Sequence, residues 1–426
     1  MTAHSPLESV FTWAAPPVTF GAGALDQAGY AVAGLGLRRV AIVTDPGVLA
    51  TGLVERVERS LALAGVESVR FSGVHVEPTD ASAGLAAAWA RAQVIDGFVA
   101  VGGGSVIDTA KAMNLLSTND GELIEYLNPP IGGGRAPTKP LRPLVAIPTT
   151  AGTGSESTAQ CVVDVLALRV KTGVGHPALR PRLAIVDPLT TLTLSPGVTA
   201  STGMDILCHA LESYTAVAFD ARPRHDPSTP RAVYNGANPI SDLWAAEALR
   251  LLGRWFRRAV EAGDDVAART GMMQAATYAG IGFGNAGVHL PHACAYPIAG
   301  LVRDYRPAGY DVAEAMVPHG QSVVATAPAC FRFTYAARPE RHEEAARLLT
   351  LDPGLPGGPE ALPAAIVALC RDVAIPNGIA AFGYGEADIP DLVAGTMKQQ
   401  RLLKISPRPA SEGDVAAIFR GSFRNW

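Results

Sequence analysis

The sequence predicts an α/β domain built on a parallel sheet, followed by an all-helical domain. The chain of 426 residues is long enough for two domains of ordinary size. In its first half, short apolar runs alternate with segments of helical periodicity, which is typical of a parallel sheet covered by helices on both faces. In its second half, nearly every apolar pattern is helical. We therefore place the two domains at residues 1–192 and 193–426.

The elements of the first domain can be placed in order from their apolar patterns. Short β-rich runs end at glycine, proline or polar turns, whereas the segments between them repeat every three to four residues. We expect strands at 38–45, 66–73, 96–104, 143–150 and 183–196, and helices at 53–65, 81–93 and 105–116. Residues 127–142 are rich in proline and glycine, and we expect a surface loop there.

The second domain is predicted to consist of helices joined by loops. Helical periodicity covers 199–216, 241–263 and 265–283, and a polar, proline-rich loop at 219–239 interrupts the pattern. Aromatic residues between 241 and 258 lie on one side of the expected helix and arginines on the other, which indicates an amphipathic helix.

Charge and composition exclude several functional classes. The chain has 35 basic and 39 acidic residues, a net charge of −4 and no stripe of lysine or arginine. Neither a nucleic acid nor an anionic membrane is therefore an expected partner. We expect a small-molecule substrate and a homodimer or higher homo-oligomer.

The compartment can be predicted from the cysteines and the N-terminal residues. Five cysteines form no CxxC pair, which fits a reducing compartment. The N-terminal residues have neither signal-peptide nor transit-peptide character, and no apolar run is long enough to cross a bilayer. We expect a cytoplasmic protein.

A glycine-rich turn follows the strand that ends near residue 101. Gly102, Gly103, Gly104 and Ser105 lead directly into a helix that carries Asp108. Glycines allow the backbone to approach a phosphate, and the start of a helix offers unpaired N–H groups and a positive dipole end. The spacing is not that of the GxGxxG fingerprint, so this turn alone does not separate phosphate binding from an ordinary tight turn.

A second turn strengthens the prediction of a dinucleotide site. Thr149, Thr150 and Thr153 follow the next strand, where hydroxyls and bare backbone can bind ribose, phosphate and amide groups. Asp45 ends an earlier strand and is placed to bind an adenosine ribose diol, which favours NAD over NADP. The alternative for Asp45 is a turn residue before a Pro-Gly pair. We expect the first domain to be Rossmann-like.

Four side chains of the second domain are candidate metal ligands. Asp205 and His209 are four residues apart on an expected helix, so they share one face. His292 and His319 lie in separate downstream segments. Four nitrogen and oxygen ligands suit Fe²⁺ or Zn²⁺, which would help an alcohol to lose its proton and polarise a carbonyl. The alternative for the Asp205 and His209 pair is a polar helix face or a cap.

His289 precedes His292 by three residues and shares its face if the stretch is helical. A histidine there can relay a proton, and we include His289 among the candidate catalytic residues. The alternative is a hydrogen-bonded core histidine that supports the ligand beside it.

Three motifs together resemble the iron-containing (group III) alcohol dehydrogenases: GGGSVIDTAK, PTTAGTGSE and GMDILCHALESY. The resemblance extends over essentially the whole chain and implies the dehydroquinate synthase-like fold of that family. It implies that the four candidate ligands bind Fe²⁺, with Zn²⁺ as the alternative, and that the two turns hold NAD. It also implies that Lys171 contacts the cofactor, for which the alternative is a solvated strand lysine.

Within that family, the chain is most similar to the hydroxyacid-oxoacid transhydrogenase branch. The similarity lies in GIGFGNAGVHLPHACAYPIAGL, NPISDLWA and SPRPASEGD, and in the long gap between His292 and His319. Simpler family members often carry a histidine four residues after the third ligand, where this chain has Tyr296. The branch implies hydride transfer through tightly held NAD, from a hydroxy acid such as 4-hydroxybutyrate to a 2-oxo acid such as 2-oxoglutarate.

Such substrates carry a carboxylate remote from the reacting carbon, which calls for a cationic group in the pocket. Arg231, Arg303 and Arg306 are candidates, and for each the alternative is an ordinary surface arginine.

Two other hypotheses stay open. One is an NAD-dependent alcohol dehydrogenase or aldehyde reductase of the same fold, acting on another small, anionic aldehyde. The other is a non-catalytic binding protein on that fold, against which the complete ligand set argues.

Overall fold

The computed structural model describes residues 6–168, 170–310, 312 and 314–426. The chain divides into two compact units. We call Ala15–Ser195 with Ala262–Met273 the sheet unit. We call Pro196–Glu261 with Gln274–Trp426, together with the described part of Met1–Ala14, the helical unit.

A parallel sheet of six strands forms the centre of the sheet unit. Its order is β1 (Val18–Phe20), β8 (Leu183–Val186), β5 (Leu144–Pro148), β4 (Gly97–Gly102), β2 (Arg39–Val43) and β3 (Glu67–Phe71). The register pairs Gly102 at the end of β4 with Pro148 at the end of β5. The glycine turn and the threonine turn therefore leave the sheet side by side at its carboxyl edge.

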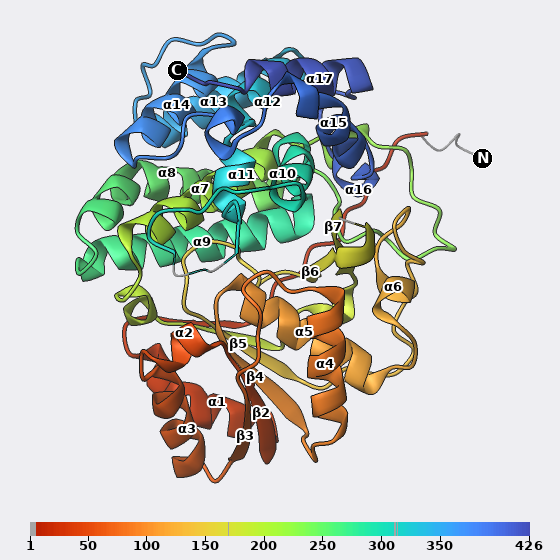
Figure 1. Cartoon of the computed structure of the whole chain (residues 1–426), viewed down its shortest axis with the longest axis vertical. Coiled ribbons are helices and arrows are strands. Elements are labelled where there is room, and N and C mark those ends of the chain that lie inside the picture. The colour runs from red at the N-terminus through yellow and green to blue at the C-terminus, as the bar shows by residue number, and fades with distance from the viewer. Residues whose placement is uncertain (1–5, 169, 311, 313) are drawn as a thin grey trace. The chain divides into compact units, whose positions relative to one another are not determined.

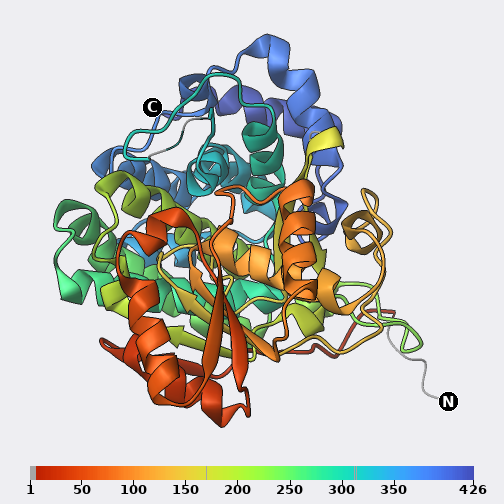
Figure 2. The same cartoon turned by 60° about the horizontal axis from the view of Figure 1, so that its bottom comes forward.

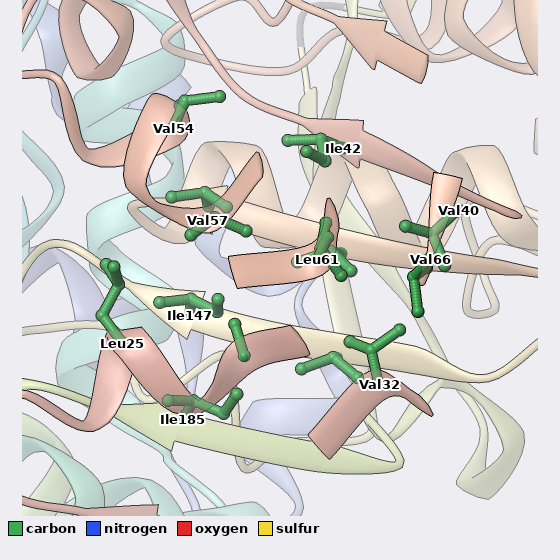
Figure 3. Close-up of a cluster of buried hydrophobic side chains, with 14 of the residues drawn as sticks. Leu25, Val32, Val40, Ile42, Val54, Val57, Leu61, Val66, Ile147 and Ile185 are labelled. Carbon is green, nitrogen blue, oxygen red and sulfur yellow. The ribbon is translucent and has the colours of Figure 1, made fainter. Parts of the chain in front are cut away.

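Alternation along the strands sends side chains to two helix layers. Val40 and Ile42 of β2 join one buried cluster, with side chains of α1 (Ala28–Gly34) and α3 (Leu53–Leu63) (Figure 3). Their neighbours on the strand join the cluster formed with α4 (Asp80–Arg91) and α5 (Gly104–Thr118). The two helix layers lie on opposite faces of the strands (Figures 1 and 2). The predicted parallel α/β architecture is confirmed.

Three strands were missed, and one predicted strand is too long. The predicted strand at 183–196 ends at Val186, and a short helical turn, Pro188–Thr191, follows. β1 is only three residues long. β6 (Gln160–Val165) and β7 (Val170–Gly175) form a separate antiparallel pair. Buried polar residues, such as Lys171 and Thr172, break the apolar pattern of this pair, so periodicity did not reveal it.

The helical unit is built from packed helices of moderate length. α7 (Pro196–Thr215) lies against α8 (Pro239–Glu261) and α11 (His319–Val324), and α10 (Leu290–Gly300) contacts α7, α11, α15 (Ile389–Met397) and α16 (Gln400–Leu403). The helical unit also contains α12 (Ala327–Thr334), α13 (Pro339–Thr350), α14 (Ala361–Asp372) and α17 (Glu412–Gly421). Helix α9 (Val266–Ala286) belongs to this unit from Gln274 onward, and its first residues belong to the sheet unit. The predicted helical second half is confirmed.

Short helices α2 (Pro46–Leu49) and α6 (Leu123–Tyr126) complete the sheet unit. Residues 127–142 contain neither helix nor strand, as predicted for a surface loop. Among the described residues, no helix combines the length and the apolar character needed to span a membrane.

Close packing of α1 on α3 gives a first prediction. A Cβ at Gly29 would lie 1.8 Å from the backbone oxygen of Ser60, so Gly29→Ala should lower the free energy of unfolding by about 1–3 kcal/mol. A Cβ at Gly34, in the same helix, would meet no atom within 4 Å, so Gly34→Ala should raise stability by about 0.5–1 kcal/mol. Denaturant unfolding of both variants measures the difference, and equal effects would contradict the packing argument.

Candidate active site

Helix α7 carries three functional side chains on one face. Asp205, His209 and Glu212 follow one another at helical spacing, and all three are buried. The helix runs through the interior of the helical unit, where Met204 to Thr215 are all buried. Polar side chains on such a helix need partners inside the protein.

The structure brings the four candidate ligands together around one oxygen. Asp205 Oδ1 lies 3.5 Å from His209 Nε2, 3.6 Å from His292 Nε2 and 3.7 Å from His319 Nε2. Asp205, His209 and His292 also form a group whose ligand atoms all lie within 4.8 Å of one another. The ring of Phe283 stacks on that of His209, with 3.9 Å between centroids.

These distances fit a shared cation better than direct hydrogen bonds. Separations of 3.5 Å or more are too long for good N–H···O bonds. Ligand atoms about 2.1 Å from a tetrahedral ion lie about 3.4 Å from one another, which is close to the observed spacing. Asp205 Oδ1 and His292 Nε2 are also buried and have no hydrogen-bond partner among the described residues. The residues therefore fit a divalent metal ion.

The pKa of Asp205 also supports a bound cation. Burial acts to raise the pKa of its carboxyl group, but His209, His319 and His292 lower it well below its usual range. A carboxylate that stays charged in a buried position needs a compensating cation.

Glu212 is a functional residue that sequence reasoning missed. The side chain is fully buried, and its Oε1 lies 2.5 Å from His292 Nδ1. Its Oε2 accepts from the backbone N–H groups of His289, at 2.6 Å, and His292, at 3.4 Å. Burial lowers the pKa of His292, whereas Glu212 and Asp205 raise it to about 9 overall. Glu212 thus fixes the ring of His292 so that Nε2 faces Asp205, as outer carboxylates do for metal-bound histidines.

His289 is the N-cap residue of α10 and is fully buried. Its Nε2 lies 3.1 Å from Thr215 Oγ1, and burial lowers its pKa to about 4. The ring is therefore neutral at pH 7. These contacts match the core-histidine alternative, and a proton relay through His289 stays a prediction.

In the sheet unit, the two turns pack closely against each other. α5 begins at Gly104, and a Cβ there would lie 2.5 Å from Thr153 Cγ2. A Cβ at Gly103 would lie 3.3 Å from Thr150. The glycines therefore leave bare backbone at the start of a helix, beside two threonine hydroxyls. This arrangement fits the pyrophosphate of a dinucleotide.

A buried polar network fixes the threonine turn to α5. Lys111 Nζ donates to Ser155 O and Oγ, both at 2.7 Å, to Gln160 O at 2.7 Å and to Thr158 Oγ1 at 3.2 Å. Ser155 Oγ in turn donates to Asp108 Oδ1 at 2.5 Å. Burial lowers the pKa of Lys111 and raises that of Asp108, and each opposes the shift of the other. Lys111 was not singled out from the sequence, because a lysine inside a helix is usually solvated.

The remaining predicted cofactor residues make contacts within the protein. Asp108 Oδ2 accepts from Val162 N at 2.9 Å, and Ser105 Oγ donates to Val76 O. Asp45 caps α2 by accepting from Val48 N at 2.9 Å, and Lys171 pairs with Glu77. These side chains are held in place, and their contacts to a cofactor stay predictions.

Comparison with known proteins decides the family. The iron-containing alcohol dehydrogenase family matches residues 15–188, and the C-terminal part of the Fe-containing alcohol dehydrogenase family matches residues 199–423. The chain belongs to the iron-containing alcohol dehydrogenase family. It is therefore an NAD-linked, metal-dependent oxidoreductase, as the sequence predicted.

Individual relatives narrow this assignment. The chain is 45% identical to the mitochondrial hydroxyacid-oxoacid transhydrogenase of Bos taurus, over 97% of this chain and 90% of the relative. Among solved structures, a 1,3-propanediol oxidoreductase has a TM-score of 0.83 and 32% identity, over 97% of this chain and all of that one. A sulfoacetaldehyde reductase from Bifidobacterium kashiwanohense, in complex with NAD+, has a TM-score of 0.80 and 26% identity, over 97% of this chain and 99% of that one. The predicted family and its transhydrogenase branch are confirmed.

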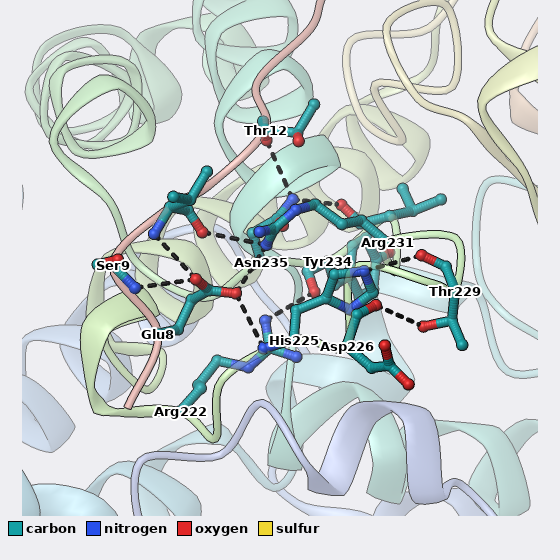
Figure 4. A network of polar contacts seen from close by, with 12 residues as sticks. Glu8, Ser9, Thr12, Arg222, His225, Asp226, Thr229, Arg231, Tyr234 and Asn235 are labelled. Atoms are coloured by element: carbon teal, nitrogen blue, oxygen red, sulfur yellow. Dashed lines mark hydrogen bonds and ion pairs between the residues drawn. The ribbon is translucent and has the colours of Figure 1, made fainter. Parts of the chain in front are cut away.

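Two of the three arginines suggested for a substrate carboxylate are paired within the helical unit. Arg231 Nη1 donates to Glu8 Oε2 at 2.8 Å and to Val10 O at 3.2 Å, and so fixes the N-terminal segment to the 219–239 loop (Figure 4). Arg303 binds Asp388 at 2.6 Å and Gly383 O at 2.5 Å. Arg306 Nη1 lies 3.5 Å from Asp304 O. The surface alternative therefore fits Arg231 and Arg303.

Glu212→Gln tests the role of the buried carboxylate. Glutamine cannot accept from both His292 Nδ1 and the two backbone amides, so the ligand ring is held less firmly. We expect the dissociation constant for Co²⁺ or Zn²⁺ to rise about 10- to 100-fold, measured by competition with a chromophoric chelator. Glu247→Gln, at a half-exposed site on α8, is the control and should bind metal normally. Normal affinity in both variants would contradict this role.

Ser155→Ala tests the network that holds the threonine turn. The variant removes the hydroxyl between Lys111 and Asp108 and should lower the free energy of unfolding by about 1–3 kcal/mol. We expect weaker NADH binding in a fluorescence titration, because the turn is less well held. Ser157→Ala is the control, since Ser157 Oγ is buried and has no hydrogen-bond partner in the described part of the chain. If both variants bind NADH equally well, the network does not position the turn.

Proposed function

We propose that this protein is a hydroxyacid-oxoacid transhydrogenase. In this reaction a 4-hydroxy acid such as 4-hydroxybutyrate loses a hydride from its alcohol carbon and a proton from its hydroxyl group. A 2-oxo acid such as 2-oxoglutarate gains both at its keto group. The products are succinate semialdehyde and 2-hydroxyglutarate, and held NAD is unchanged overall.

The observation that carries this proposal is the buried Asp205 oxygen surrounded by three imidazole nitrogens. A divalent cation held there by Asp205, His209, His292 and His319 would favour loss of the alcohol proton and polarise the carbonyl of the acceptor. Asp205 contributes the negative charge of the site, and Glu212 holds His292 in the orientation that a ligand needs. Full-length similarity to the transhydrogenase of Bos taurus selects this branch over a simple dehydrogenase.

The cofactor would be held by the sheet unit. The glycine turn at the start of α5 and the threonine turn, fixed by Lys111 and Ser155, offer backbone amides and hydroxyls. NAD supplies the hydride acceptor for one substrate and the donor for the other. Asp45 supports NAD over NADP, since a carboxylate at that strand end disfavours a 2′-phosphate.

The proposal also covers the identity of the metal, the oligomeric state and the cellular location. Fe²⁺ is supported by the family to which the chain belongs, although the same ligand types accept Zn²⁺. A homodimer is proposed on the general prevalence of such assemblies. The cytoplasmic location stays a prediction from the sequence, and the relative from Bos taurus is described as mitochondrial.

The proposal predicts turnover without added cofactor. Metal-loaded protein mixed with 4-hydroxybutyrate and 2-oxoglutarate should form 2-hydroxyglutarate, measured by mass spectrometry, with no NAD(H) supplied. Asp205→Ala should lower the rate about 1000-fold, because the charge that holds the metal is lost. Elemental analysis should show about one metal ion per wild-type chain and little in the variant.

The competing hypotheses give different results in the same assay. Turnover only with stoichiometric NAD(H), and no response to 2-oxo acids, would identify a simple dehydrogenase or aldehyde reductase. Protein without bound metal, even after reconstitution, and without turnover would favour a binding protein.

A further inference from the structure

Arg401 differs from the other arginines of the helical unit. It lies on α16, and its guanidinium group sits 4.9 Å above the ring of Tyr234. The side chain is partly exposed, yet its Nη1 is closed to solvent and has no hydrogen-bond partner among the described residues. No carboxylate within the described ranges pairs with Arg401, whereas Arg231 and Arg303 each bind one.

The surroundings keep Arg401 positively charged. Loss of hydration acts to lower the pKa of its guanidinium group, but the side chains of Tyr234 and Tyr296 raise it overall. A guanidinium group keeps its charge under all ordinary conditions. A buried N–H on a permanent cation, with no acceptor, is costly, and an anion that arrives from solution would remove that cost.

The tyrosine neighbours of Arg401 connect it with the candidate metal cluster. Tyr296, one of its two tyrosine neighbours, stacks beside the ring of His319 with centroids 6.4 Å apart. Tyr234 and Tyr296 share one buried apolar cluster with Phe283, which covers His209. α16, which carries Arg401, packs on α10, which carries His292 and Tyr296. Two independent contacts therefore connect the neighbours of Arg401 with two of the candidate ligands.

The chemistry of the two proposed substrates calls for one such cation. In 4-hydroxybutyrate, two methylene groups separate the alcohol carbon from the carboxylate. In 2-oxoglutarate, two methylene groups likewise separate the keto carbon from the distal carboxylate. A single anion site at a fixed distance from the reacting carbon would therefore serve the donor and the acceptor in turn.

We propose that Arg401 binds the remote carboxylate of both substrates and thereby selects hydroxy acids and oxo acids of this spacing. Its guanidinium group offers planar, charged donors suited to a carboxylate, and Tyr234 and Tyr296 hold that group in place. The inference rests on the proposed function for the identity of the substrates. The anion site itself can be tested without turnover.

Binding of glutarate, which carries two carboxylates and no reacting group, tests the site directly. Calorimetric titration of metal-loaded Arg401→Met should give a dissociation constant about 100-fold higher than that of the wild type. Arg401→Lys should fall between them, because lysine keeps the charge and loses the planar pair of donors. Arg408→Met is the control, since Arg408 is exposed on the same C-terminal tail, where it donates to the backbone oxygen of Phe333 and stacks on the ring of that residue. The thermal unfolding of all the variants is compared, so that a loss of folding is recognised.

Steady-state kinetics give the second readout. For Arg401→Met we expect the KM values for the hydroxy acid donor and the oxo acid acceptor to rise by similar factors, with kcat much less affected. Activity with 1-butanol as donor and 2-oxopentanoate as acceptor should change less than threefold, because neither has a carboxylate at the remote position.

The outcomes separate this inference from the proposed function. Loss of glutarate binding in Arg401→Met, in a protein without transhydrogenase activity, would support the anion site and reject the proposed reaction. Transhydrogenase activity with unchanged glutarate binding and unchanged KM values in Arg401→Met would overturn the assignment of Arg401. An equal loss of kcat with substrates that carry the remote carboxylate and with substrates that lack it would show that Arg401 only supports the fold.

Discussion

One buried carboxylate oxygen, facing three imidazole nitrogens, is the constraint on which the centre of the helical unit depends. Asp205 and Glu212 bring two negative charges into the interior on a single face of α7. One divalent cation held by Asp205 and the three histidines would balance both carboxylates. Without such balance, the free-energy cost of burying two carboxylates would exceed the stabilisation that their hydrogen bonds provide. The two helices that supply His292 and His319, α10 and α11, must therefore converge on this point of α7.

The sheet unit meets a similar demand in a different way. There, Nζ of the buried Lys111 lies 3.7 Å from Oδ1 of the partly buried Asp108, and Ser155, which bonds to both, joins a helix to a loop. This network fixes the threonine turn beside the glycine turn, whose residues Gly102 to Gly104 carry no side chains. A bound pyrophosphate requires loops that are held firmly and a backbone that it can approach closely.

Much of the fold and of the candidate metal site could be predicted from the sequence, for physical reasons. Buried strands such as β2 and β4 are continuous apolar runs, and the Asp205 and His209 pair is visible because helix geometry places residues four apart on one face. The β6–β7 pair was missed, since buried polar residues such as Lys171 hide its pattern. Glu212 was missed because a glutamate on a helix is usually solvated, although its position on the face of Asp205 and His209 was an available signal.

The choice among arginines shows where sequence reasoning stops. Arg231, in a polar loop, and Arg303, in the long gap before His319, were reasonable candidates by position, yet each already has a carboxylate partner in the folded chain. Nothing in the local sequence of Arg401 separates it from a surface arginine. What distinguishes it is a donor left without an acceptor, a property that arises only when distant tyrosines close around the guanidinium group. An interior donor without a partner, beside a reactive centre, is better evidence of a ligand than the residue type alone.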